Sequence, residues 1–105
     1  MAIVEVAVIP MGTKTPSVSK YVAKALKVLE RSNVKYEVTS TGTIIEGDLE
    51  KVLNLAKEMH ESVFNEEVSR VVTVIRIDDR RDKPLTIEGK LKSVEEKLGK
   101  VPANR

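Results

Sequence analysis

The chain has 105 residues, and its 18 basic and 16 acidic side chains give a formal net charge of +2 at pH 7. This length suits one domain with a single two-layer core, and the near-balanced charge creates no long-range field that would favour nucleic acid as a partner. Because cysteine is absent, disulfides, thiolate metal sites and cysteine nucleophiles are excluded. No apolar run approaches the roughly 20 residues of a membrane span, and no signal-peptide pattern opens the chain. We therefore expect a cytoplasmic protein without a membrane partner, and the high charged fraction without glutamine is typical of a thermophile.

The first predicted strand, Ala2 to Ile9, is apolar on both faces. Valines 4, 6 and 8 share one face, whereas Ile3, Ala7 and Ile9 lie on the other with Glu5 among them. A strand that is apolar on both faces is covered on both faces. One cover must therefore come from elsewhere in the fold or from a second subunit.

A strand-to-helix junction follows. Pro10-Met11-Gly12 is expected to end the strand, and Thr15-Pro16 predicts a helix start, with threonine as the N-cap and proline at the first helical position. Apolar residues then recur at helical spacing to about Arg31, which predicts an amphipathic helix. The hydroxyls near its start, including Ser17 and Ser19, could cap the helix or bind an anion.

The middle of the chain, Tyr36 to Gly47, predicts a β-hairpin. Two β-rich runs flank Ser40-Thr41-Gly42, and Gly42 is expected to supply a turn conformation with positive φ. The hairpin carries more hydrogen-bonding side chains than its stability requires, which is a first indication of a ligand. These side chains are Thr39, Ser40, Thr41, Thr43 and Glu46.

The second half predicts a helix, a strand and another helix. Asp48 can cap a helix that runs to near Asn65, and Arg70 to Ile77 is rich in β-branched residues. A third helix follows from Ile87 to Leu98. The element order predicts an α+β fold, a ferredoxin-like βαββαβ antiparallel sheet with an added C-terminal helix, in one domain of residues 1–99 with a flexible tail at 100–105.

Several charged residues leave alternatives open. The Glu46 carboxylate shares a face with Ile44, so it either needs a partner or escapes to water at the strand end. Arg76 and Arg80 stand among aspartates, which is typical of an ion-pair network but could also hold sulfate or phosphate. His60, the single histidine, is expected on the surface.

No catalytic set emerges from the sequence. We find no nucleophile with a base, no acid–base pair and no metal-ligand spacing. The sequence therefore indicates a binding protein and not an enzyme, with no metal or catalytic cofactor.

Four segments together resemble the family of small thiamine-binding proteins. They are V-I-P-M-G-T, S-V-S-K-Y-V, Y-E-V-T-S-T-G-T-I-I-E-G and R-V-V-T-V-I-R-I-D-D-R-R-D-K, and the resemblance extends from about Val4 to Leu98. It implies a ferredoxin-like fold, subunits that pair through their sheets into a homotetramer, and a ligand such as thiamine or a related pyrimidine, bound without chemistry.

The resemblance also implies where the ligand binds. The implied ligand-binding residues are Ser17, Ser19, Tyr36, Thr41, Thr43 and Glu46. Hydroxyls and a carboxylate can match the ring nitrogen and exocyclic amine of an aminopyrimidine. The alternative hypothesis is a regulatory or structural homo-oligomer that responds to an anion such as sulfate or phosphate, and the third is an enzyme acting on a thiamine precursor through Asp78 or Glu46.

Overall fold

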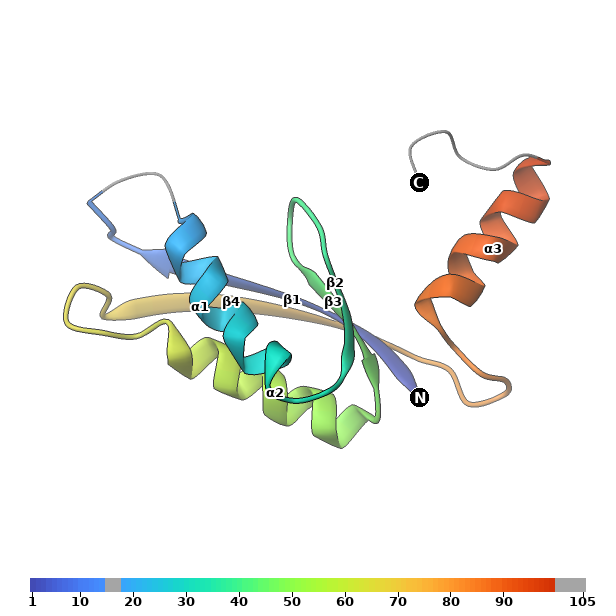
Figure 1. Ribbon diagram of the computed structural model, residues 1–105, viewed down its shortest axis with the longest axis horizontal. Helices are drawn as coiled ribbons and strands as arrows, with labels where there is room; N and C mark the ends of the chain where they lie inside the picture. Colours follow the sequence, from blue (N-terminus) through green and yellow to red (C-terminus); the bar gives the residue numbers. More distant parts are fainter. Residues whose placement is uncertain (15–17, 100–105) are drawn as a thin grey trace.

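The computed structural model describes residues 1–14 and 18–99, and its four strands form one antiparallel sheet in the order β2-β3-β1-β4. Helices α1 and α2 pack together on one face of this sheet, and α3 projects from one end of it (Figure 1). The ferredoxin-like βαββαβ order with an added C-terminal helix is thus confirmed. The elements are β1 (Ala2–Met11), α1 (Ser19–Glu30), β2 (Lys35–Val38), β3 (Thr43–Gly47), α2 (Leu49–Ser62), β4 (Arg70–Asp79) and α3 (Ile87–Leu98).

Strand β1 occupies the centre of the sheet, but its two neighbours pair with it over different lengths. On one side β4 pairs with β1 without interruption from Ala2 to Met11. On the other side β3 pairs only with Ala2 to Val6, because β3 begins at Thr43, opposite Val6. The second half of β1 therefore has a free side.

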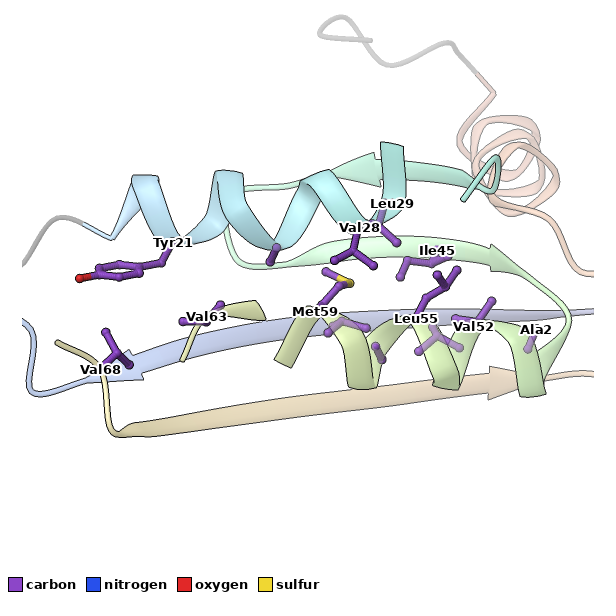
Figure 2. Close-up of a cluster of buried hydrophobic side chains, with 14 residues drawn as sticks. Ala2, Tyr21, Val28, Leu29, Ile45, Val52, Leu55, Met59, Val63 and Val68 are labelled. Carbon is purple, nitrogen blue, oxygen red and sulfur yellow. The ribbon is translucent and has the colours of Figure 1, made fainter. Parts of the chain in front are cut away.

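The core lies between the sheet and the two helices. Val4, Val6 and Ile45 point inward from the sheet and are essentially inaccessible to solvent. They meet apolar side chains from both helices, including Leu29 of α1 and Met59 of α2 (Figure 2). Burial of β-branched side chains on one sheet face against one apolar stripe of each helix gives the two-layer arrangement.

The boundaries of α2 follow from side-chain hydrogen bonds. The Asp48 carboxylate accepts a hydrogen bond from the Lys51 backbone N–H at 3.4 Å, which confirms Asp48 as the N-cap of α2. The helix ends at Ser62, before the expected end near Asn65. The Asn65 side-chain oxygen accepts from the backbone N–H groups of Glu67 and Val68, at 2.8 and 2.9 Å, and this turn replaces further helix.

Two expectations about the first strand and the hairpin are wrong. Strand β1 continues through Pro10 to Met11, and it tolerates proline there because β4 is its only neighbour beyond Val6. Gly42 has no positive φ. Glycine is favoured there by close packing, because a Cβ would lie 3.1 Å from the Val6 carbonyl oxygen and the hairpin turn or β1 would have to shift by a few tenths of an ångström.

His60 is half-buried, and its expected place on the open surface is wrong. Its Nδ1 lies 2.6 Å from the Thr73 hydroxyl on β4, and its ring meets Phe64 edge-on at 5.3 Å. The histidine therefore joins α2 to the inner face of β4. The Thr15-Pro16 helix start and the tail at 100–105 lie outside the described residues.

The face of the sheet opposite α1 and α2, here called the outer face, is covered only in part. Leu85 and Ile87, at the start of α3, are buried against one end of it. Apolar side chains on the rest of that face are exposed, as is an apolar stripe on α3. The exposed residues are Ile9, Met11, Val72 and Val74 on the sheet and Leu91, Val94 and Leu98 on α3.

Replacing Ile45 with alanine should destabilise the fold by about 2–5 kcal/mol, because it leaves a cavity at the centre of the core. Urea unfolding at fixed protein concentration measures this loss. Val38→Ala on the neighbouring strand is the control, since its side chain is half exposed, and it should change stability by less than about 0.5 kcal/mol. Equal losses in the two variants would contradict this description of the core.

Candidate ligand-binding site

A cavity of about 250 Å³ opens where β1 loses its neighbour on the β3 side. It is bounded by β1 from Val6 to Ile9, by the hairpin from Val38 to Thr43, and by α1. The hairpin turns at Gly42, beside Val6, so β3 does not pair with β1 beyond Val6. The cavity is therefore a direct consequence of the shorter β1–β3 pairing.

The cavity has an apolar floor and a hydroxyl-bearing wall. The floor comes from β1, α1 and α2, and the wall comes from the hairpin, which contributes Thr39, Ser40, Thr41 and Thr43. Among the described residues, no charged side chain lines it. The floor residues are Val6, Ala7, Val8, Ile9, Val18, Val22, Ala25, Leu26 and Met59.

The hydroxyls of the wall differ in their availability. The Thr39 hydroxyl donates to the Gly42 carbonyl at 2.8 Å and accepts from the Thr41 backbone N–H at 3.4 Å, so it holds the turn in shape. Thr43 is only 4% exposed, and its hydroxyl makes no hydrogen bond within the described part of the chain. Ser40 and Thr41 are exposed at the rim. Thr43 is thus the wall residue best placed to bond an enclosed ligand.

The structure brings together only some of the residues that the sequence singled out. Thr41 and Thr43 both line the cavity. Ser19 is exposed at the first position of α1, beside the cavity residue Val18, but does not line the cavity itself. Tyr36 packs against the core from β2, and Ser17 lies outside the described residues.

Glu46 lies on the outer face of the sheet, away from this cavity. Thr43 and Ile45 point inward, so the alternation along β3 places Glu46 on the opposite side, where it pairs with Ile3. The structure therefore separates Glu46 from the two threonines by the thickness of the sheet.

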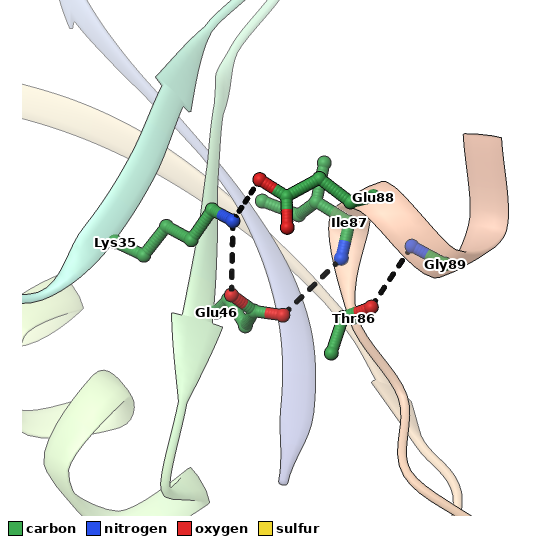
Figure 3. A network of polar contacts seen from close by, with 6 residues as sticks. All are labelled: Lys35, Glu46, Thr86, Ile87, Glu88 and Gly89. Atoms are coloured by element: carbon green, nitrogen blue, oxygen red, sulfur yellow. Dashed lines mark hydrogen bonds and ion pairs between the residues drawn. The ribbon is translucent and has the colours of Figure 1, made fainter. Parts of the chain in front are cut away.

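A polar network surrounds the Glu46 carboxylate (Figure 3). The carboxylate is buried and accepts a hydrogen bond at 3.3 Å from the backbone N–H of Ile87, the first residue of α3. Its other oxygen lies 3.9 Å from the Lys35 ammonium, which also bonds Glu88. A carboxylate at a helix N-terminus is stabilised by the helix dipole. Glu46 thus has the partner that its apolar surroundings require, and it fastens α3 to the sheet.

The neighbouring charges are also paired. The hydrogen bond from Lys35 to Glu88 raises the pKa of the lysine above its usual value, so the ammonium stays charged. Arg76 donates to Glu5 at 3.2 Å, and Arg80 holds Asp82, whose pKa falls to about 2 because of that hydrogen bond. The two arginines considered for anion binding therefore already have carboxylate partners.

Sequence reasoning missed the apolar part of the cavity. Val18, Val22 and Leu26 recur every four residues on α1, on a stripe beside the fully buried positions. The sequence did contain a signal for it: the apolar face of α1 is wider than packing against the core alone requires. This wider apolar face could not be assigned to a cavity without knowing where the pairing between β1 and β3 stops.

The fold and the cavity define a small α+β protein with a site for a small molecule. Residues 4–95 match the model of the thiamine-binding protein family, and the chain belongs to this family. It is 48% identical over 94 residues to UPF0045 protein MJ1052 of Methanocaldococcus jannaschii, covering 90% of this chain and 92% of that protein. UPF0045 protein YqgV of Bacillus subtilis is 47% identical over 102 residues, with 93% and 98% covered.

Solved structures show the same fold. The crystal structure of MJ1052 superposes with a TM-score of 0.83 at 46% identity, over 90% of this chain and 96% of that one. A Thermotoga maritima protein proposed to act in thiamine biosynthesis or salvage gives a TM-score of 0.73 at 24% identity, over 89% of this chain and 97% of that one. At that identity, the second likeness concerns the fold alone.

The described residues contain neither a candidate metal site nor a candidate membrane span. Over residues 1–14 and 18–99, no group of three or more histidine, aspartate or glutamate side chains is arranged to hold a metal ion. Within the same ranges, none of the helices combines the length and the apolar character needed to cross a membrane.

Replacing Glu46 with alanine should loosen α3 by about 1–3 kcal/mol, because the Ile87 N–H loses its buried acceptor. Native-state hydrogen exchange should show faster exchange of the α3 amides, while those of β1 keep their protection. Glu88→Gln is the control, since it removes only an exposed ion pair worth at most about 1 kcal/mol. Unchanged exchange in α3 of the Glu46 variant would contradict the fastening role.

Proposed function

We propose that this protein binds thiamine or a related aminopyrimidine, without transforming it, in the cavity between α1 and the hairpin. The observation that carries the proposal is an apolar cavity walled by hydroxyl-bearing side chains, among them Thr43, which is 4% exposed. Membership of a family named for thiamine binding supports it.

The chemistry of the cavity suits a heteroaromatic ring. Ligand sites are mostly apolar, with a few polar groups that fix orientation. A hydroxyl both donates and accepts, so Thr43 and Thr41 can match a ring nitrogen and an exocyclic amine. At about 250 Å³ the cavity is near the lower end of ligand-site volumes, which favours one substituted ring over a larger molecule.

The uncharged lining supports a proposal for which part of thiamine enters the cavity. A buried cation without a partner is costly, so we place the neutral pyrimidine inside and the positively charged thiazolium at the exposed rim, near Ser40 and Thr41. Strong stacking on an aromatic ring is not part of the proposal, because no aromatic side chain lines the cavity.

Neither alternative function is favoured by a specific observation. Anion binding would need free cations, but Arg76 and Arg80 are paired with Glu5 and Asp82. Catalysis through Asp78 or Glu46 would need these groups beside the ligand, and both lie on the outer face, away from the cavity. We therefore propose a binding role and no reaction.

Isothermal titration with thiamine should give saturable binding near one ligand per chain, and Thr43→Val should weaken it by about 5- to 150-fold, since one buried hydrogen bond is lost. Thr73→Val is the matched control, a half-buried strand threonine outside the cavity, and should bind as the unmodified protein does. Thiamine phosphates and inorganic phosphate serve as comparison ligands.

Thiamine binding by the Glu46→Gln variant distinguishes a site in the cavity from a site on the outer face of the sheet. Loss of thiamine binding in this variant, with Thr43→Val unaffected, would move the site to the outer face and overturn the cavity assignment. Binding of phosphate without any binding of thiamine would instead favour the anion-responsive assembly.

We further propose that the chain assembles into a homotetramer, a dimer of dimers, in which outer faces of the sheets pack together. This proposal rests on the exposed apolar residues of that face, among them Ile9, which is 44% exposed. A contiguous apolar patch of this kind typically marks an interaction site.

Sedimentation of the unmodified chain should give the mass of four chains, and Ile9→Glu should halve it, because a carboxylate would be buried in the contact between the faces. Val38→Glu, a half-exposed valine on β2, should keep the original mass. A monomeric unmodified chain would contradict this assembly.

A further inference from the structure

A second cavity, here called the outer pocket, lies on the outer face of the sheet beside the start of α3. Its volume is about 250 Å³, similar to that of the cavity between α1 and the hairpin. Strands β1, β3 and β4 line it together with one side chain of α3. The residues that give the pocket its chemical character are Ile3, Glu5, Ile44, Arg76, Asp78 and Lys90.

The position of the outer pocket follows from the register of the sheet. Glu5 of β1 is paired with Ile44 of β3 on one side and with Arg76 of β4 on the other. Side chains of directly paired residues share a face, so these three form one row across the outer face. In the next row, two residues along β1, Ile3 is paired with Asp78. The start of α3 is fastened at this second row, so the helix and the first row bound the pocket from two sides.

Charges of opposite sign alternate along the wall of the pocket. Arg76 donates to Glu5 at 3.2 Å, and Lys90 of α3 bonds Asp78. The isoleucines of β1 and β3 that also line the pocket are half-buried and give it an apolar floor. Each of the four charged side chains is at least 30% exposed. Ion pairs this exposed contribute little to stability, so a ligand can replace one of them at small cost.

The pairing of these charges decides which class of ligand fits. A ligand with only a carboxylate would take a cation away from Glu5 or Asp78. A ligand with only an ammonium group would take a carboxylate away from Arg76 or Lys90. Either exchange leaves one charged side chain without its partner, so little is gained. A ligand that carries both groups can replace both halves of an ion pair at once, and all the charges stay paired.

We propose that the outer pocket binds a free α-amino acid with an apolar side chain. The carboxylate of the amino acid lies against Arg76, whose planar guanidinium matches a carboxylate through two parallel hydrogen bonds, and its ammonium group lies against Glu5. The apolar side chain packs on the isoleucine floor and is removed from water. At about 250 Å³ the pocket is below the usual range of ligand sites, which favours a molecule as small as one amino acid.

This site is separate from the proposed thiamine site. The outer pocket lies on the outer face, whereas Thr43 points inward to the other cavity, so the sheet stands between the two. Ile9, on which the proposed packing of outer faces rests, is four residues from Glu5, or about 13 Å along β1. That contact therefore does not require the residues of the pocket.

Isothermal titration of the unmodified protein with L-leucine should give saturable binding near one ligand per chain, with L-valine and L-methionine titrated in parallel. Isocaproate has the same carbon skeleton without the ammonium group, and isoamylamine lacks the carboxylate. Each should bind at least about tenfold more weakly than L-leucine, because it leaves Glu5 or Arg76 without a partner. Saturating thiamine should leave the affinity for L-leucine unchanged.

Two variants test the charge contacts through ligand preference. In Glu5→Gln the preference for L-leucine over isocaproate should fall at least about tenfold, because the ammonium group loses its partner while Arg76 still bonds the carboxylate. In Arg76→Gln the preference over isoamylamine should fall by a similar factor. Each preference is a ratio measured on one variant, so a partial loss of folded protein does not change it. Arg81→Gln is the matched control, since it removes an ion pair with Asp79 outside the pocket, and it should bind as the unmodified protein does.

The outcomes separate the possibilities. Binding of L-leucine, with each preference lost in its own variant and kept in Arg81→Gln, supports the amino-acid site. Absence of binding by all three amino acids, or equal binding of L-leucine and its one-charge analogues, would overturn it. Displacement of L-leucine by thiamine would overturn the assignment to a separate pocket on the outer face.

Discussion

The unequal pairing of β1 is the constraint on which the rest of the structure depends. Strand β4 follows β1 along its whole length, whereas β3 joins it only as far as Val6. Gly42 lies close to the Val6 carbonyl at that limit, where an added Cβ would make a tight contact of 3.1 Å with the carbonyl oxygen. Beyond Val6, β3 no longer pairs with β1. The cavity lies between this unpaired side of β1, the hairpin and α1.

The same arrangement divides polar groups between two faces with different tasks. Inward-pointing Thr43 offers a hydroxyl to the cavity, and outward-pointing Glu46, three residues later, accepts the first N–H of α3. A hydroxyl can remain available at modest cost when buried beside a cavity. A buried carboxylate without a partner is much more costly, and Glu46 accordingly has hydrogen-bond and ion-pair partners. The proposed ligand site and the anchoring of α3 thus lie on opposite sides of one short strand.

Exposed apolar side chains lie on the outer face, on the β4 edge and along α3, and Ile9, Val22 and Val38 are exposed where they line the cavity. A chain of this size can form one core and still leave apolar surface on a sheet with helices on only one face. Assembly through the outer faces would remove part of this surface from water. Because Ile9 belongs both to the cavity lining and to the proposed contact between outer faces, the proposed sites of binding and of self-association meet at this part of β1.

The sequence by itself determined the element order and the N-cap at Asp48, because these depend on local spacing, and it left open whether Glu46 has a partner or reaches water. It also indicated the family through four separate segments. Only the tertiary structure decided that Thr43 and Glu46 lie on opposite faces of the sheet and that Pro10 continues β1. It alone showed that Gly42 serves a close approach and that α1 lines a cavity. These features depend on which strands pair and where the pairing stops, and contacts between residues far apart in the chain leave no mark in local spacing.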